Sequence, residues 1–206
     1  MGLPPAEYDA VTKAATGQSP SYRPPGHPEI GRDLGRTLLR PVTRYPENIV
    51  LADNLTPEQL PKVYGHEIGY VIDQLAGEIP TGGLSGELKV LYNTLNNPNR
   101  TGGEAASWGK PFTPEASGYK GANVPREFMA EAIRANMADP NYIKTVAPKT
   151  AVAIRAAVNA DPEVSRIVQF NMGGSPLAAA LAGTASPAKQ QPGFDWEKLY
   201  RTGGAK

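Results

Sequence analysis

The sequence has no cysteine among its 206 residues. Disulfide bonds, thiolate metal ligands and a cysteine nucleophile are therefore excluded, while the redox compartment stays open. It also has no apolar run of about 18 residues, the length that predicts a membrane-spanning helix. The N-terminal residues lack the basic start and the apolar core of a Sec signal peptide. These absences predict a soluble protein without a membrane span or a cleaved signal.

An excess of charge of one sign is absent as well, because 21 basic and 20 acidic residues give a formal net charge of +1. Such a chain has no overall field to attract nucleic acid or an anionic lipid surface. Its basic side chains form only small clusters, which we expect to be solvated: Arg36, Arg40 and Arg44, and Lys144 and Lys149. We therefore expect no nucleic-acid partner.

Glycine and proline are abundant, with 22 and 21 residues, nearly double their usual combined share. We expect residues 1–35 to form an irregular Pro/Gly-rich arm with one short helix at Ala6–Ala15. Residues 36–172 should form the folded domain, and residues 173–206 a low-complexity tail. One segment of this tail, Phe194–Tyr200, contains three aromatic residues. We expect it to dock on the domain or on a partner.

Local patterns place the elements of the domain. Apolar spacing, prolines in first turns and glycine stops predict helices at 61–76, 86–96, 124–138, 148–160 and 162–170. Short apolar runs bounded by Pro, Asn and Asp predict strands at 38–42 and 48–52. Residues 97–122 are expected to be a loop. Together these elements predict an α+β domain that is mostly helical and has a small sheet.

The first long helix contains the segment His66-Glu67-Ile68-Gly69-Tyr70. In the zinc-peptidase pattern H-E-x-x-H, two imidazoles four residues apart lean toward one metal ion, and the Glu acts as general base. Here His66 and Glu67 are present, but Tyr70 occupies the position of the second histidine. Taken alone, the segment is weak evidence for a metal site, because a solvated His66–Glu67 pair and a half-buried Tyr70 are the more common arrangement.

A second helix carries Glu127 and Glu131 four residues apart. Two like charges at this spacing repel each other mildly. A metal ion at one carboxylate and a hydrogen-bonded ligand at the other would offset the repulsion. An ordinary acidic helix face balanced by Arg126 and Arg134 is the alternative interpretation.

Taken together, these segments resemble the zinc-peptidase domain of anthrax lethal factor and its relatives, which occur in bacterial toxins and effectors and in phage-encoded proteins. The matching stretches are Gly65–Asp73, Arg126–Ala132 and Ala147–Thr150, in the family's order, and they cover about residues 60–155. The resemblance implies a zincin-like fold, with the small sheet beside the active-site helix. It also implies zinc-dependent hydrolysis of peptide bonds.

The resemblance assigns the residues of the metal site. It implies that His66 and Glu127 are zinc ligands of a gluzincin arrangement, with Tyr70 at the position of the remaining ligand. It implies that Glu67 is the general base. By the same resemblance, Asp73 and Glu131 would hold the zinc ligands in orientation.

Substrate contacts follow from the same resemblance. Tyr119 is the best match for the tyrosine with which this family stabilises the oxyanion. The strand that contains Ile49, Val50 and Leu51 would be the edge strand on which an extended peptide adds as a further strand. The expected partner is accordingly a protein or peptide substrate.

Tyr70 leaves two functions open. A neutral phenol, with an ordinary pKa of about 10, is a poor zinc ligand, although Zn²⁺ can bind a phenolate. One hypothesis is an active metallopeptidase. The other is a catalytically inactive zincin fold, a pseudoenzyme that serves as a structural or binding component of a phage virion or of a secreted toxin or effector assembly. In the second case the terminal arms would contact structural protein partners, and the protein would be virion-associated or exported by a route without a signal. The other histidine, His27, is expected to lie in a surface loop.

Overall fold

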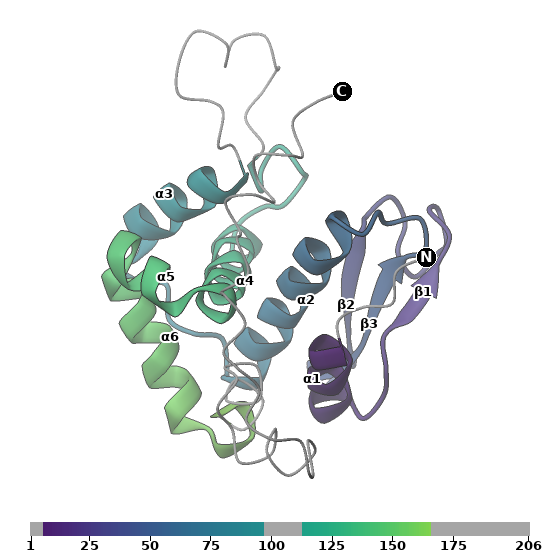
Figure 1. Ribbon diagram of the computed structural model, residues 1–206, viewed down its shortest axis with the longest axis horizontal. Helices are drawn as coiled ribbons and strands as arrows, with labels where there is room; N and C mark the ends of the chain where they lie inside the picture. The colour runs from purple at the N-terminus through teal and green to yellow at the C-terminus, as the bar shows by residue number, and fades with distance from the viewer. Residues whose placement is uncertain (1–5, 97–112, 166–206) are drawn as a thin grey trace, which may run out of the picture.

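The computed structural model describes residues 6–96 and 113–165 of the chain (Figure 1). Its elements are, in order, α1 (Ala6–Thr16), β1 (Ser21–Arg23), β2 (Gly35–Leu39), β3 (Pro46–Ala52), α2 (Gln59–Leu75), α3 (Ser85–Asn96), α4 (Asn123–Ala138), α5 (Pro140–Val146) and α6 (Pro148–Ala160). The sheet lies on one side, α2 lies beside it, and α3 to α6 form the other side (Figure 1). The expectation of an α+β fold that is mostly helical with a small sheet is confirmed.

The sheet has three strands in the order β1-β3-β2. β1 runs parallel to β3, with Tyr22 opposite Leu51, and β2 runs antiparallel to β3, with Thr37 opposite Ile49. Ile49, Val50 and Leu51 are fully buried. The prediction that these residues form an edge strand is therefore wrong, because β3 is central and has a partner on each side. Within the described residues, β1 and β2 form the edges of the sheet.

The N-terminal segment, which we expected to be an irregular arm, instead contributes to this core from residue 6 onward. The expected short helix is present as α1, and its Val11 and Ala15 are buried. The hydroxyl of Thr12 lies 2.6 Å from that of Tyr64 in α2. Ile30, in the loop between β1 and β2, is also fully buried and packs near Val50. These contacts place residues 6–35 inside the folded domain.

Helix α2 has clear start and stop signals. The Gln59 side chain accepts a hydrogen bond from the Thr56 N–H at 3.0 Å, and the Thr56 hydroxyl accepts one from the Gln59 N–H at 3.3 Å. This reciprocal pair has the pattern of a capping box and closes the turn directly before α2, whose N-cap residue Glu58 makes no side-chain cap hydrogen bond itself. At the other end, Gly77 has a φ of +73° and the Glu78 N–H donates to the Asp73 carbonyl at 2.8 Å. The predicted glycine stop of this helix is therefore confirmed.

The remaining helices agree with the predicted positions, with one addition. α3, α4 and α6 lie where apolar spacing predicted them. The helix α5 was not predicted, because Asp139-Pro140 was interpreted only as the end of α4. Its Asp139 carboxylate in fact accepts hydrogen bonds from the N–H groups of Asn141 and Tyr142, so the same two residues also start a helix.

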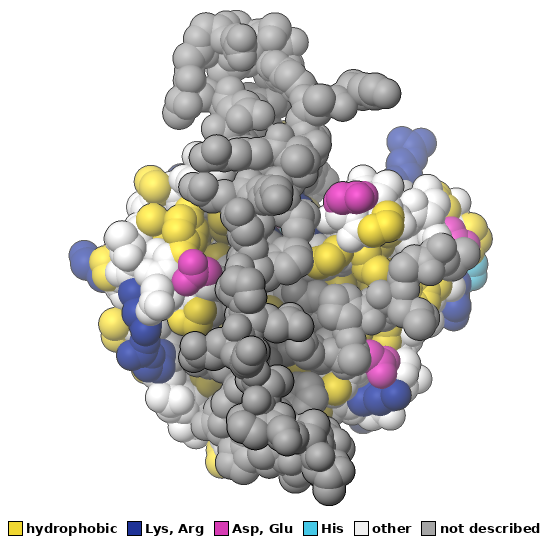
Figure 2. Space-filling view, in the orientation of Figure 1, with side chains coloured by type: hydrophobic (Ala, Val, Ile, Leu, Met, Phe, Trp, Pro, Cys, Tyr) yellow, Lys and Arg dark blue, Asp and Glu magenta, His cyan; other side chains and the backbone are white. Residues whose placement is uncertain are grey.

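Part of the predicted organisation lies outside the described residues. The helix expected at 162–170 begins at 162, and the described chain ends at Ser165. Most of the 97–122 loop and the tail from residue 173, including Phe194–Tyr200, also lie outside. In the described part, no helix is both long enough and apolar enough to span a bilayer. On the face shown in Figure 2, the Lys and Arg side chains lie in small separate groups.

Candidate active site

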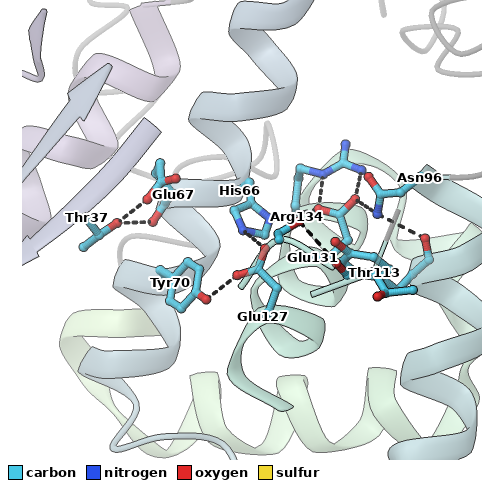
Figure 3. Close-up of polar contacts among 11 residues, drawn as sticks. Thr37, His66, Glu67, Tyr70, Asn96, Thr113, Glu127, Glu131 and Arg134 are labelled. Atoms are coloured by element: carbon cyan, nitrogen blue, oxygen red, sulfur yellow. Dashed lines mark hydrogen bonds and ion pairs between the residues drawn. The ribbon is translucent and has the colours of Figure 1, made fainter. Parts of the chain in front are cut away.

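The candidate site lies where α2 and α4 cross. A Cβ atom on Gly69 would lie only 2.2 Å from the Ala130 carbonyl oxygen, so the absence of a side chain at this position lets the two backbones meet. Gly69 lies between His66 and Tyr70 in sequence. The close crossing therefore brings both of these side chains opposite the carboxylates of α4 (Figure 3).

His66 lies between the two carboxylates that the sequence grouped with it. Its Nε2 atom is 3.2 Å from Oε1 of Glu127, and its Nδ1 atom is 3.0 Å from Oε2 of Glu131. Burial alone would lower the pKa of His66, but these two carboxylates raise the pKa to about 10. The imidazole is therefore held as a cation, and both ring nitrogens donate.

Tyr70 provides the second hydrogen-bond partner of Glu127. Its hydroxyl donates to Oε2 of Glu127, and its ring meets the His66 ring edge-on with a centroid distance of 5.4 Å. Burial and the Glu127 carboxylate raise the pKa of Tyr70 far above its ordinary value, so the phenol stays protonated. Each oxygen of Glu127 is accordingly bound, one by His66 and the other by Tyr70.

Glu131 is the most heavily bonded residue of the cluster. Besides His66, it accepts hydrogen bonds from Asn96 Nδ2 at 3.0 Å and from Arg134 Nε at 2.9 Å, and it is only 2% exposed. Burial would raise the pKa of Glu131, but Arg134 and His66 hold it well below its ordinary value. The predicted role of Glu131, which is to orient His66, is compatible with this geometry. Asn96, at the end of α3, had no signal in the sequence.

Glu67 points away from this cluster, toward the sheet (Figure 3). Its Oε2 atom accepts a hydrogen bond from the Thr37 hydroxyl of β2 at 2.9 Å. A Cβ atom on Gly35 would lie 2.9 Å from Oε1 of Glu67, so glycine makes room for the carboxylate between α2 and β2. Burial raises the pKa of Glu67 to about 7. Thr37 and Gly35 are site residues that the sequence analysis missed.

Asp73 does not contact the residues expected to bind zinc. Both oxygens of its carboxylate accept hydrogen bonds from Arg126, Oδ1 at 2.9 Å and Oδ2 at 2.8 Å. Oδ1 also accepts one from the Ile79 N–H at 2.8 Å. Arg126 donates in addition to the Ile79 carbonyl at 2.7 Å. Asp73 therefore braces the end of α2 against the start of α4.

Tyr119 lies next to the cluster, just before α4. Burial raises its pKa, and so do the carboxylates of Glu127 and Glu67. Its expected role in stabilising an oxyanion stays a prediction. His27 lies in the loop between β1 and β2, where its Nδ1 atom accepts a hydrogen bond from the Glu29 N–H at 3.2 Å.

The donor set tests whether a catalytic zinc ion fits here. The 3.2 Å between His66 Nε2 and Glu127 Oε1 suits two ligands of one tetrahedral Zn²⁺ with bonds of about 2.0–2.2 Å. The remaining donor is the protonated phenol of Tyr70, already bonded to Glu127. Among the described residues, no group of three or more His, Cys, Asp or Glu side chains is arranged to hold a metal ion. Because catalytic zinc sites use three protein ligands, the residues present do not fit one.

Comparisons with protein-family models, with curated proteins and with solved structures found no match for this chain. The resemblance to lethal factor peptidases therefore rests on the motif residues alone.

Proposed function

We propose that this chain is a zincin-like scaffold, similar to the peptidase domain of anthrax lethal factor, in which Tyr70 closes the metal position. Its function in this proposal is to bind an extended segment of a partner protein without cleaving it efficiently. The observation that carries the proposal is that both carboxylate oxygens of Glu127 already have partners: Tyr70 hydrogen-bonds one oxygen and His66 pairs with the other. The setting that the resemblance implies is a phage virion or a secreted toxin or effector assembly.

Two features support the zincin-like part of the proposal. His66 on α2 and Glu127 on α4 face each other, and Glu131 holds the other nitrogen of His66. Glu67 lies on the opposite side of the cluster, between α2 and the strand β2. His66, Glu127 and Glu131, from two distant segments, thus meet at one point, whereas Glu67 leaves α2 on the side of the sheet.

The charges of the His66, Glu127, Glu131 and Arg134 side chains support the proposal that the site holds no metal ion. The His66 imidazolium pairs with the carboxylates of Glu127 and Glu131, and the Arg134 guanidinium pairs with Glu131, so each negative group has a positive partner. Buried charges are costly unless they are paired and hydrogen-bonded. This cluster meets both conditions with its own side chains, and a bound cation is not needed to stabilise it.

The position of strand β2 supports the proposal that the protein binds an extended peptide segment. β2 pairs with β3 along one side, and its Thr37 contacts Glu67 of α2. Within the described residues, its other side has no strand partner. An extended peptide can add to such an edge through main-chain hydrogen bonds.

One observation favours the second candidate function, an active zinc peptidase. A general base works best when its pKa lies near the working pH, and burial raises the pKa of Glu67 to about 7. This function requires that Tyr70 lose its proton to bind Zn²⁺ beside His66 and Glu127, and that the Glu67 side chain turn from Thr37 toward the metal. A zinc ion held there would supply a Lewis acid for peptide hydrolysis.

Zinc content separates the two candidates. Purified wild-type protein, Tyr70→His, Tyr70→Phe and the double variant Tyr70→His/Glu127→Gln are dialysed against trace zinc and measured by elemental analysis, with circular dichroism to verify folding. We expect about one zinc per chain only in Tyr70→His, because only this variant has three ligands. Tyr70→Phe controls for the loss of the hydroxyl.

One zinc in the wild-type protein, absent from a single Glu127→Gln variant measured in the same way, would instead support the peptidase. A protease assay would follow, with Glu67→Gln as the inactive control. In that case, cleavage that Glu67→Gln abolishes without unfolding the chain would contradict the closed-site proposal.

A further inference from the structure

A pocket of about 630 Å³ lies between α3 and the first turns of α4. Leu88 of α3 and Val124, Pro125 and Phe128 of α4 provide its apolar lining, and the ring of Tyr119 lines it from the loop before α4. The volume falls within the range of about 300–1,000 Å³ that is typical of ligand pockets. It is therefore large enough to receive bulky apolar side chains.

The rim of this pocket is charged. Lys89 and Lys120 line it with exposed side chains, and Glu115 lies on the same rim. Within the part of the chain that the structure describes, neither lysine forms an ion pair with another residue. An apolar floor with a mainly basic rim suits an occupant that combines aromatic side chains with carboxylates.

We propose that this pocket binds the chain's own C-terminal segment Phe194–Tyr200. This segment, Phe-Asp-Trp-Glu-Lys-Leu-Tyr, contains four large apolar side chains with two carboxylates and one lysine between them. The apolar side chains match the floor. Asp195 and Glu197 match the two rim lysines, and Lys198 matches Glu115.

The tether is long enough for this contact. The N-terminal turn of α6 lies beside α3, since Glu87 accepts a hydrogen bond from the Thr150 N–H at 2.8 Å. Glu87 directly precedes the pocket residues Leu88 and Lys89. The 13 residues of α6 extend about 20 Å away from this point before the described chain ends at Ser165.

Residues 166–193 connect Ser165 to the aromatic segment and are rich in Gly, Ala, Ser and Pro. A chain segment of 28 residues can reach at most about 90–100 Å, well beyond the length of about 20 Å that α6 adds. Docking within one chain then occurs at an effective concentration on the order of millimolar. Even weak contacts suffice for occupancy under these conditions.

Tryptophan fluorescence tests the proposal, because the chain has only two tryptophans, Trp108 and Trp196. The full chain with Trp108→Phe reports on Trp196 alone. We expect blue-shifted emission and an acrylamide quenching constant several-fold below that of a free peptide with the sequence of residues 194–200. Solvent-like emission and free-peptide quenching would overturn the proposal.

Charge reversal locates the docking site. In the Trp108→Phe background, Lys89→Glu with Lys120→Glu should shift the Trp196 emission to the red and restore quenching. Arg40→Glu with Arg44→Glu, at exposed positions between β2 and β3, makes the same change of net charge away from the pocket and should leave the signal unchanged. Equal effects of both pairs, or no effect of either, would show that Trp196 is buried elsewhere and would overturn the assignment.

Dilution separates docking within one chain from docking between two copies. The Trp196 emission of the Trp108→Phe protein should be independent of concentration, because the segment and the pocket belong to the same molecule. A red shift on dilution would place the segment in the pocket of a second copy and would overturn docking within one chain.

Discussion

Gly69 of α2 faces the Ala130 carbonyl of α4 so closely that a Cβ atom would lie 2.2 Å from the oxygen. Because the obstacle is backbone, a larger residue can be accommodated only if the helices separate. We expect Gly69→Ala to lower the free energy of unfolding by about 2–3 kcal/mol, measured by urea denaturation. Gly86→Ala in α3 is the matched control, since nothing lies within 4 Å of its Cβ position. Similar stabilities for the two variants would contradict the close crossing.

The Tyr70 hydroxyl should contribute measurably to stability. Tyr70→Phe leaves Oε2 of Glu127 without its partner, and an unsatisfied buried acceptor costs about 1–3 kcal/mol. Tyr45→Phe removes a hydroxyl from a ring that is 39% exposed and should change the free energy of unfolding by much less. Chemical denaturation of both variants measures the difference. A small, equal effect in the two would mean that Tyr70 does not hold Glu127.

The buried Glu67 should make stability depend on pH. Burial raises its pKa from an ordinary value of 4.5 to about 7. Between these values the folded protein keeps a proton that the unfolded chain has released, so the free energy of unfolding falls as the pH rises from 4.5 to 7. Glu67→Gln cannot ionise and keeps an acceptor for Thr37.

The Glu67→Gln variant should therefore match the wild type below pH 4.5 and exceed its stability by about 2–3 kcal/mol above pH 7. Urea denaturation across this range, with a chelator present, measures the difference. Glu163→Gln, at an exposed position, is the control and should follow the wild-type profile. A constant gap between wild type and Glu67→Gln at every pH would contradict the raised pKa.

The buried and the exposed ion pairs should differ strongly in their effect. Asp73 is fully buried and binds Arg126 through both carboxylate oxygens, so Asp73→Asn should cost about 3–5 kcal/mol. The pair of Asp33 and Arg36 has side chains that are 52% and 43% exposed, and Asp33→Asn should cost less than about 1 kcal/mol. Thermal unfolding of the two variants gives the comparison. Comparable losses would argue against Asp73 as the brace between α2 and α4.

The helices were predictable because their signals are local, whereas the grouping of His66 with Glu127 and Glu131 came from the resemblance of the motifs to a known family. Gln59 and Gly77 mark the ends of α2 within a few residues, and the Glu127–Glu131 spacing shows that both lie on one helix face. The sheet order was not predictable, because β1 has three residues and no periodic pattern. Its pairing with β3 depends on contacts between distant segments.

The same reason explains which site residues were missed. Thr37 and Asn96 reach the site from β2 and α3, and neither has a sequence spacing that links it to His66 or Glu67. The direction of Glu67 follows from Gly35, whose missing side chain leaves the space. The resemblance implied that Asp73 orients the zinc ligands, but its carboxylate binds Arg126 instead, a pairing between distant segments that no local pattern signals.

The parallel pairing of β1 with β3 also protects the protein from self-association. Ser21–Arg23 covers the edge of β3 at Val50–Ala52, and an uncovered, apolar strand edge is a template for intermolecular pairing. A fragment that begins at residue 36 would lose this cover together with α1. Such a fragment should aggregate, measured by light scattering, whereas a fragment that begins at residue 6 should stay monodisperse. The N-terminal segment is thus expected to prevent β3 from pairing with a strand of another molecule.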